Sequence, residues 1–127
     1  MITPPRKVEV RYIKGKGRGV VCVSTIHKGE IIERAPIVVL TPEEGEYIRK
    51  ASSILKHYSL ELTAINRNVL QLGYGMMYNH SIDPNSDISY DTNNDLVDIV
   101  ALRDIKEGEE VVFNYNFDDK EDFLPME

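Results

Sequence analysis

The sequence has 127 residues, with 15 lysines and arginines against 21 aspartates and glutamates, so its formal net charge is −6. This length suits one domain, and a composition of 42% hydrophobic and 28% charged residues excludes a disordered tail or a basic nucleic-acid clamp. No apolar run approaches the roughly 18 residues that span a bilayer, the N-terminus lacks a signal-peptide stretch, and the single cysteine, Cys22, excludes a disulfide framework or a multi-cysteine zinc site. We therefore expect a soluble intracellular domain.

The first 40 residues predict three strands. Residues 8–12 alternate apolar and polar side chains, which is the period of a strand. The glycine-rich block at 15–19 breaks this pattern, and the β-branched residues 20–23 form a second strand. A largely apolar run at 31–40 contains Pro36, which lacks an N–H for the ladder, so this strand is expected to bend or to lie at a sheet edge.

Thr41 begins the one well-marked helix. Pro42 suits the first helical position and Glu44 completes a capping box with Thr41, so we expect a short helix that ends near Ser52. Residues 54–72 carry short apolar pieces and are interpreted as a hairpin.

A second hairpin is predicted where the turn residues 91–95 separate residues 88–90 from 96–102. A final strand is expected at 111–115, followed by an acidic tail. Many short strands with turns about every ten residues indicate a mainly β fold, and a single helix does not suit a doubly wound α/β sheet.

Charge is distributed unevenly along the chain. Residues 1–29 carry seven basic residues and one acidic residue, whereas residues 71–127 carry three basic and fourteen acidic ones. One interpretation is an ordinary soluble surface. The other is a basic face for a small anionic ligand and an acidic face for a cationic one.

Several motifs remain ambiguous when they are considered singly. The glycines of the 15–19 block permit close backbone approach to a ligand, but they equally suit a tight hairpin turn. Residues 91–95 begin like a calcium loop but lack its later glycine and glutamate, so they are interpreted as a turn. The three histidines have no metal-ligand spacing, and Cys22, inside a β-branched strand, is expected to be a buried small hydrophobe.

Three blocks, in this order and spacing, resemble the SET domain of protein-lysine methyltransferases. Residues 15–20 resemble its G-x-G-x-G-[VL] block, residues 79–85 its N-H-S-x-x-P-N block, and residues 108–115 its G-E-E-[LI]-x-x-x-Y block. The K-G-E turn at 28–30 matches as well, and residues 72–75 resemble the small stand-alone viral and bacterial members.

The resemblance implies the β-clip SET fold: several short sheets, one or two short helices and a C-terminal pseudoknot. It implies a single SET domain over residues 1–127, with a core at about 7–117. The short acidic segment 118–127 is then available to close the site.

The resemblance also implies S-adenosyl-L-methionine as the cofactor and a lysine side chain as the methyl acceptor. Gly15, Lys16, Gly17 and Arg18 would hold the methionine end of the cofactor. The cofactor's amino group and adenine would be held by Asn79 and His80, which precede Ser81 in the second block. No metal is implied.

Tyr115 would lie at the methyl-transfer point and contact the cofactor. Phe113, two residues earlier on the same strand face, implies room for more than one methyl group, although it is equally suited to the core. An aromatic residue of the tail, Phe117 or Phe123, would stack on the adenine. Asn114 and Asn116 flank the tyrosine where the family often has Asp or Gly.

The expected partner is a basic protein or peptide, with a histone tail as the candidate, and neither nucleic acid nor a membrane is expected. A second subunit could complete the lysine channel, which makes a homodimer plausible. The expected location is cytoplasmic, or nuclear in a eukaryotic cell. The alternative function is a SET-like binding module without turnover.

Overall fold

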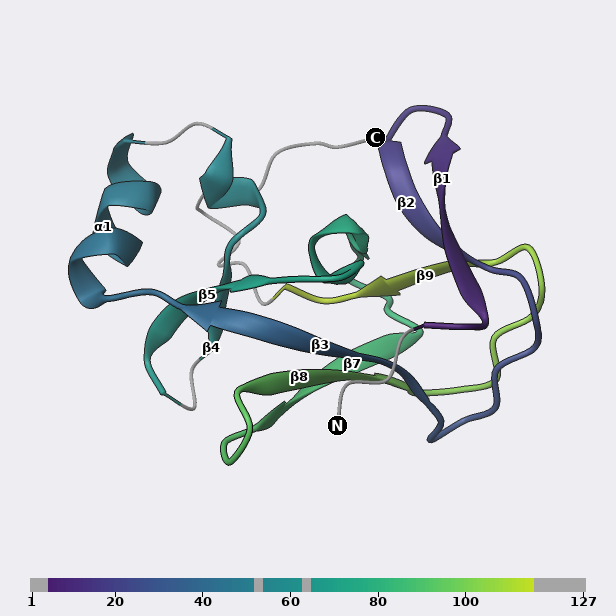
Figure 1. The fold of residues 1–127 in the computed structure, drawn as a ribbon. Coiled ribbons are helices and arrows are strands. Elements are labelled where there is room, and N and C mark those ends of the chain that lie inside the picture. The colour runs from purple at the N-terminus through teal and green to yellow at the C-terminus, as the bar shows by residue number, and fades with distance from the viewer. Residues whose placement is uncertain (1–4, 52–53, 63–64, 116–127) are drawn as a thin grey trace.

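The computed structural model describes residues 5–51, 54–62 and 65–115, which form a strand-rich fold with one short α-helix (Figure 1). The strands are β1 (Val8–Ile13), β2 (Gly17–Cys22), β3 (Ile31–Val39), β4 (Leu60–Leu62), β5 (Arg67–Gln71), β6 (Asn79–His80), β7 (Ser86–Asp91), β8 (Leu96–Ala101) and β9 (Glu110–Phe113). The helices are α1 (Pro42–Ala51) and two 3-10 turns, η1 (Leu55–His57) and η2 (Gly75–Met77). The mainly β prediction is confirmed.

The strands are hydrogen-bonded in the order β1-β2-β9-β7-β8-β3-β5-β4, and β6 is added beside β9. Most neighbours are antiparallel, but β9 pairs in parallel with both β6 and β7. In Figure 1, α1 lies at one end of the molecule and the β1–β2 hairpin at the other. The strand β9 lies between them and is where chain segments from both halves of the sequence meet.

The β1–β2 hairpin corrects the prediction that the whole glycine block interrupts the strands. The turn comprises residues 14–16, and β2 resumes at Gly17, which pairs with Ile13. The two glycines at the turn, Gly15 and Gly17, have φ values of +86° and +85°. Residues that have a Cβ rarely adopt this backbone conformation. The block therefore makes a tight turn and also contributes backbone to the sheet.

The strand β3 is not at an edge, contrary to one of the two expectations for it. Its first part, up to Pro36, pairs with β8, and its last three residues pair with β5. Pro36 lies where the strand changes partners, so its missing N–H interrupts neither ladder in mid-course. The other expectation, a bend caused by Pro36, stays a prediction, and the register shift in the ladder with β8 lies elsewhere, between Ile31 and Glu33.

The helix and the hairpin that follows it were predicted from local patterns. In the capping box, the Thr41 N–H donates to Glu44 Oε1 at 2.9 Å and the Glu44 N–H donates to Thr41 Oγ1 at 3.1 Å. The helix ends at Ala51, close to the predicted end. The strands β4 and β5 pair as an antiparallel hairpin, preceded by the 3-10 turn η1.

The main core cluster is built mostly from side chains of β1, β2, β3, β8 and β9. Its largest fully buried side chains are Tyr78 and Phe113, and Tyr74, Met77 and Tyr115 pack against the cluster. Cys22 is buried within it, as predicted, and burial raises the pKa of its thiol. The second block and the end of the third block are therefore built directly into the core.

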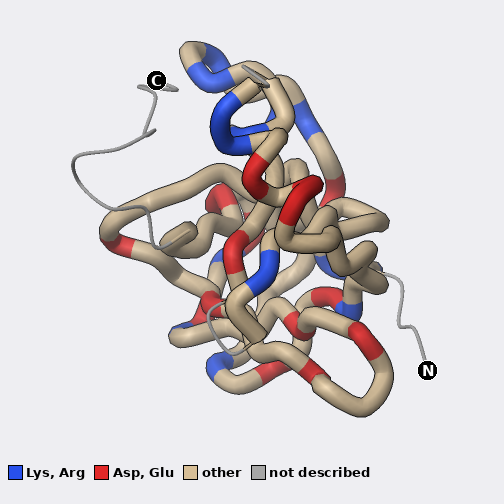
Figure 2. Tube along the Cα trace, turned by 90° about the vertical axis from the view of Figure 1, so that its left-hand side faces the viewer, with Lys and Arg blue, Asp and Glu red and all other residues tan. Residues whose placement is uncertain are grey.

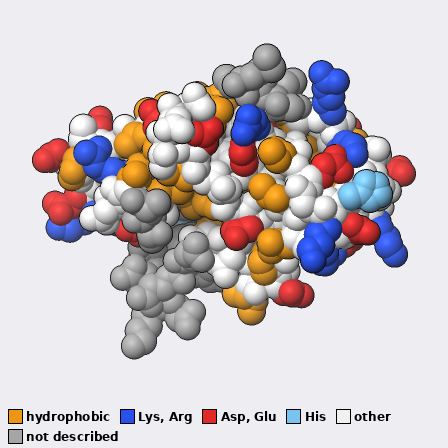
Figure 3. Space-filling model, turned by 90° about the horizontal axis from the view of Figure 1, so that it is seen from below, with side chains coloured by type: hydrophobic (Ala, Val, Ile, Leu, Met, Phe, Trp, Pro, Cys, Tyr) orange, Lys and Arg blue, Asp and Glu red, His pale blue; other side chains and the backbone are white. Residues whose placement is uncertain are grey.

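Charged residues are distributed over the whole backbone trace. Figure 2 shows several Lys and Arg segments around the β1–β2 hairpin at the top, and further Lys and Arg segments among the Asp and Glu segments in the middle and lower part. On the face shown in Figure 3, hydrophobic side chains lie mainly across the middle and charged ones toward the ends. Within the residues that the structure describes, no helix is long and apolar enough to cross a membrane.

Candidate active site

Parallel pairing brings the second and third sequence blocks together. Asn79 of β6 is opposite Val112 of β9, and His80 is opposite Phe113. The Ser81 N–H extends the contact by donating to the Phe113 carbonyl at 3.1 Å. Segments about thirty residues apart in the chain thus become neighbouring strands.

Asn85 joins the loop of the second block to β9 through two hydrogen bonds. Its Nδ2 donates to the Glu110 carbonyl at 2.8 Å, and its Oδ1 accepts from the Val112 N–H at 2.9 Å. The side chain thereby replaces a neighbouring strand for two backbone groups, and only 2% of the residue is exposed. The last residue of the N-H-S-x-x-P-N block consequently has a structural role that its residue type alone did not reveal.

The glycine block joins the same place through β2, which pairs with β9 at Glu110 and Val111. Asn79 Nδ2 donates to the Arg18 carbonyl at 3.2 Å and to Glu110 Oε2 at 2.6 Å. Glu110 Oε1 pairs with Lys16 Nζ at 3.0 Å. One carboxylate therefore connects all three sequence blocks.

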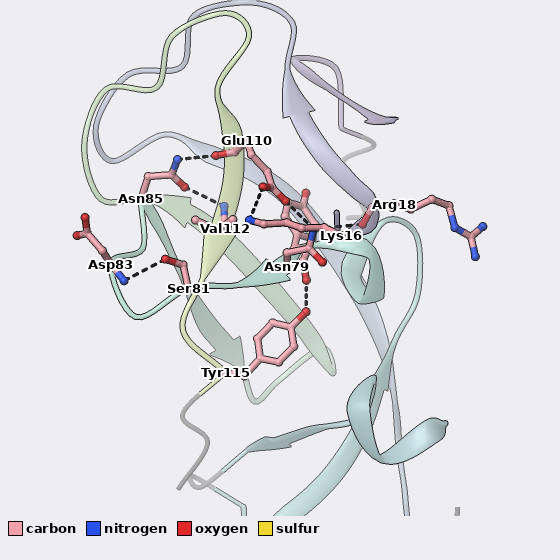
Figure 4. A network of polar contacts seen from close by, with 10 residues as sticks. Lys16, Arg18, Asn79, Ser81, Asp83, Asn85, Glu110, Val112 and Tyr115 are labelled. Atoms are coloured by element: carbon pink, nitrogen blue, oxygen red, sulfur yellow. Dashed lines mark hydrogen bonds and ion pairs between the residues drawn. The ribbon is translucent and has the colours of Figure 1, made fainter. Parts of the chain in front are cut away.

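Figure 4 shows how the predicted cofactor residues lie. Lys16 extends toward Glu110 and Asn79, whereas the Arg18 guanidinium points away from this group. Arg18 contributes its backbone carbonyl, which accepts from Asn79 Nδ2. Gly17 contributes a positive φ at the start of β2 and has open space where a Cβ would be.

A cavity of about 530 Å³ opens beside these residues. Its walls include Lys16, His80, Ser81, Ile82, Glu109 and Glu110. This volume is within the range of about 300–1,000 Å³ that small-molecule sites have. Lys16 and Glu110 supply one charge of each sign along the same wall, which suits a ligand that itself carries both charges.

Tyr115 is anchored at three points. Its hydroxyl donates to the Tyr78 carbonyl, its N–H donates to His80 Nδ1 at 2.9 Å, and its ring meets the His80 ring edge-on at 5.3 Å between centroids. Burial raises the pKa of the Tyr115 hydroxyl, and the nearby Tyr58 and Glu110 add to this rise. The hydroxyl therefore stays protonated at physiological pH and acts as a hydrogen-bond donor, not as a base.

Phe113 is fully buried and lies between two tyrosines. Its ring centroid is 5.8 Å from that of Tyr78 and 5.0 Å from that of Tyr115. It is thus a core residue that also borders Tyr115, and the interpretation that it leaves room for further methyl groups stays a prediction. Phe117 and Phe123, the candidates for adenine stacking, lie outside the described residues.

Sequence reasoning assigned no role to Glu33 and Tyr78. The Glu33 carboxylate is 2% exposed and accepts from the Tyr78 hydroxyl at 2.8 Å and from the Tyr74 N–H at 2.9 Å. Burial raises the pKa of this carboxyl group. An acidic residue inside the apolar run 31–40 was the signal that could have drawn attention to it.

Comparison with protein families shows that the family model of the SET domain matches residues 17–116 of this chain. The chain belongs to the SET-domain family. A histone-lysine N-methyltransferase of Schizosaccharomyces pombe, specific for lysine 37 of histone H3, is 31% identical over 112 residues. This match covers 85% of the chain and 72% of the yeast protein.

Two further relatives agree with this assignment. The zebrafish (Danio rerio) N-lysine methyltransferase KMT5A-A is 27% identical over 122 residues, which cover 84% of the chain but only 34% of that protein. A crystal structure of a candidate histone methyltransferase from Plasmodium falciparum superposes with a TM-score of 0.69 at 28% identity, covering 91% of this chain and 98% of the other. The SET domain described here is accordingly a protein-lysine methyltransferase.

Proposed function

We propose that this SET domain transfers methyl groups from S-adenosyl-L-methionine to a lysine side chain of a histone or another basic protein, and that it adds more than one methyl group per lysine. The observation that carries the proposal is the position of Tyr115. Its protonated hydroxyl is held against the Tyr78 carbonyl, at the strand pair that also borders the cavity.

The cavity residues fit this cofactor. Its amino-acid end carries an ammonium and a carboxylate, and the cavity wall offers Glu110 as an acceptor and Lys16 as a cation. The Asn79 side chain, which donates to the Arg18 carbonyl and to Glu110, lies next to the same wall. When bound, the cofactor supplies an electrophilic methyl group on a sulfonium, and the chain's task is to hold the partners in line.

The residues around Tyr115 suit the demands of a lysine acceptor. A lysine must be neutral to react, although its ordinary pKa is about 10.4. Phe113 and Tyr78 are buried beside Tyr115, and an amine brought to the Tyr115 hydroxyl would be desolvated next to this part of the core, which lowers the pKa of an amine. Tyr115 cannot accept the proton because burial keeps its hydroxyl protonated, so the lysine proton must leave to solvent before transfer.

Phe113 supports the addition of more than one methyl group. By resemblance to the family, a tyrosine at this position retains a water near the amine and favours monomethylation, whereas phenylalanine leaves room. Mass spectrometry of the methylated product should therefore show di- or trimethyl-lysine, and Phe113→Tyr should shift the product toward monomethyl-lysine. Only monomethyl-lysine from the unmodified enzyme would contradict this part of the proposal.

The substrate class is proposed from the chain's own charge and from its relatives. The net charge of −6 favours association with a basic segment, and such attraction weakens with added salt. The names of the yeast and Plasmodium proteins both refer to histones. We also propose that residues 1–127 form one SET domain, and that a second subunit is available to complete the lysine channel.

The deciding experiment is transfer of a radiolabelled methyl group from S-adenosyl-L-methionine onto histones and cell lysate. Tyr115→Phe removes the hydroxyl and should lower kcat by about a hundredfold or more. Tyr90→Phe is the matched control, because the Tyr90 hydroxyl donates to Asp95 on an exposed turn. Cofactor binding without labelling of any substrate would favour a binding module without turnover, and no cofactor binding would refute the proposal.

A further inference from the structure

Glu110, which starts β9, has an unusual environment for a glutamate at a strand end. Only 18% of its side chain is exposed, and each carboxylate oxygen has its own partner. Oε1 pairs with Lys16 Nζ at 3.0 Å, and Oε2 accepts from Asn79 Nδ2 at 2.6 Å. Figure 4 shows this group at the junction of the three sequence blocks.

These contacts determine which way the Asn79 amide faces. Its Nδ2 is directed at Glu110 Oε2 and at the Arg18 carbonyl, and both of these atoms are acceptors only. If the amide were reversed, Oδ1 would oppose two acceptors and lose two hydrogen bonds. The carboxylate therefore forces Oδ1 to the other side, where it accepts no hydrogen bond from the described residues and is available to a donor.

Gly19 makes this arrangement possible. A Cβ at this position would lie 2.3 Å from Ile13 Cδ1, 2.6 Å from Glu110 Oε2 and 2.8 Å from Asn79 Nδ2, closer than real Cβ atoms approach other atoms. Since the φ of Gly19 is not positive, its backbone does not demand glycine. The absence of a side chain here instead leaves room for the carboxylate and the amide to meet.

Glu110 also balances the charge of Lys16. Without the carboxylate, the Lys16 ammonium would remain uncompensated beside Asn79 and would repel a second cation there. With it, the pair is neutral overall and the free acceptor on Asn79 favours a cationic donor. The geometry and the charges thus indicate the same kind of ligand group, an ammonium.

We propose that Glu110 is a positioning residue that orients the Asn79 amide so that Oδ1 receives the ammonium of the cofactor's amino-acid end. This inference rests on the proposed use of S-adenosyl-L-methionine. In this role Glu110 affects only the binding of the amino-acid end of the ligand, because the adenosine part has no ammonium. Loss of the carboxylate should therefore weaken only ligands that carry the amino-acid end.

The test is calorimetric binding of two ligands, S-adenosylhomocysteine and 5′-methylthioadenosine, which lacks the amino-acid end. We expect Glu110→Gln to weaken the binding of S-adenosylhomocysteine about tenfold, and Glu110→Leu to weaken this binding more. Binding of 5′-methylthioadenosine should change by less than twofold in both variants. Glu107→Gln, on the exposed turn before β9, makes the same change in net charge and should bind both ligands like the unmodified protein.

A double-mutant cycle shows whether Glu110 acts through Asn79 or only through Lys16. In an Asn79→Ala background, Glu110→Gln should have no further effect on S-adenosylhomocysteine binding. A persisting tenfold loss in that background would mean that Glu110 acts through Lys16, and would overturn the proposed role. Equal weakening of both ligands, or no weakening of either, would overturn it as well.

The outcomes also separate this inference from the proposed function. If the unmodified protein binds S-adenosylhomocysteine and Glu110→Gln binds it equally well, only the role of Glu110 fails. If the unmodified protein binds neither ligand, the cofactor assignment fails and the inference falls with it. Far-UV circular dichroism and thermal unfolding of each unliganded variant identify a folding defect. If Glu110→Leu does not fold, the binding data for Glu110→Gln, the nearly isosteric change, decide the test.

Discussion

Gly73 is the position where the structure makes the sharpest stability prediction. Its φ is +64°, in the left-handed region, and a Cβ there would lie 2.4 Å from Glu33 Oε2. That oxygen is buried and accepts from the N–H of the next residue, Tyr74, at 2.9 Å. Gly73→Ala would therefore both strain the backbone and push the carboxylate off its donor.

The two costs can be estimated separately. The left-handed conformation costs a residue with a Cβ about 1–2 kcal/mol. A buried polar group that loses its hydrogen-bond partner costs about 1–3 kcal/mol more. We expect Gly73→Ala to lower the free energy of unfolding by about 3 kcal/mol, a large share of the roughly 5–15 kcal/mol that holds a domain folded.

Gly29→Ala is the matched control. Gly29 also has a positive φ, +86°, but no atom lies within 4 Å of the place where its Cβ would be. This variant should lose only the conformational cost, about 1–2 kcal/mol. The change in unfolded-state entropy is common to both substitutions, so it cancels in their difference.

Equilibrium urea unfolding gives the loss in free energy of unfolding for both variants. Far-UV circular dichroism monitors the unfolding, because the chain has no tryptophan. Placing Gly73→Ala in a Glu33→Ala background should remove the excess cost over Gly29→Ala, since the opposing oxygen is gone. If Gly73→Ala costs no more than Gly29→Ala, or if its excess cost survives the removal of Glu33, the close approach to the carboxylate is not what requires glycine at this position.

Three further predictions follow from other contacts. Asn85→Ala should lower the free energy of unfolding by about 2–4 kcal/mol, because it leaves the buried Val112 N–H and the Glu110 carbonyl without partners; urea unfolding measures this, and a loss under 1 kcal/mol would contradict it. Thr41→Ala should cost about 1 kcal/mol through loss of the helix cap, with rescue by Thr41→Ser in the same assay. The raised pKa of Glu33 contributes stability that is present below the ordinary pKa of a glutamate and is lost as the pH rises through the folded-state pKa. The unmodified protein should therefore lose stability relative to Glu33→Gln as the pH rises above the ordinary pKa of a glutamate. A difference that stays constant as the pH rises would show that Glu33 does not titrate as described.

The elements predicted correctly are those set by neighbours in the chain. The capping box at Thr41 is made within three residues, and the hairpin around residues 91–95 needs only a turn and two flanking apolar segments. One error was local, because the turn in the glycine block is shorter than predicted, and the error about the edge position of β3 arose because its partners are distant. Nothing local indicates that β3 pairs with β8 up to Pro36 and with β5 beyond it.

The candidate site divides in the same way. The three sequence blocks predicted which residues gather, and β6, β2 and β9 bring them together. The direction of each side chain remained open: Arg18 contributes its carbonyl whereas its guanidinium points away, and Lys16 pairs with Glu110. Glu33 was missed because its two partners are about forty residues away.

By itself, the sequence determined the family and the mainly β class and proposed the residues of the site, because hydrophobic period, capping and motif spacing are properties of the chain alone. Only the tertiary structure decided that the Asn79 amide donates to Glu110, that the Tyr115 hydroxyl remains a donor, and that a Cβ at Gly73 would collide with a carboxylate. Hydrogen-bond direction, burial and close approach depend on atoms supplied by distant segments, so they exist only once the strands have paired.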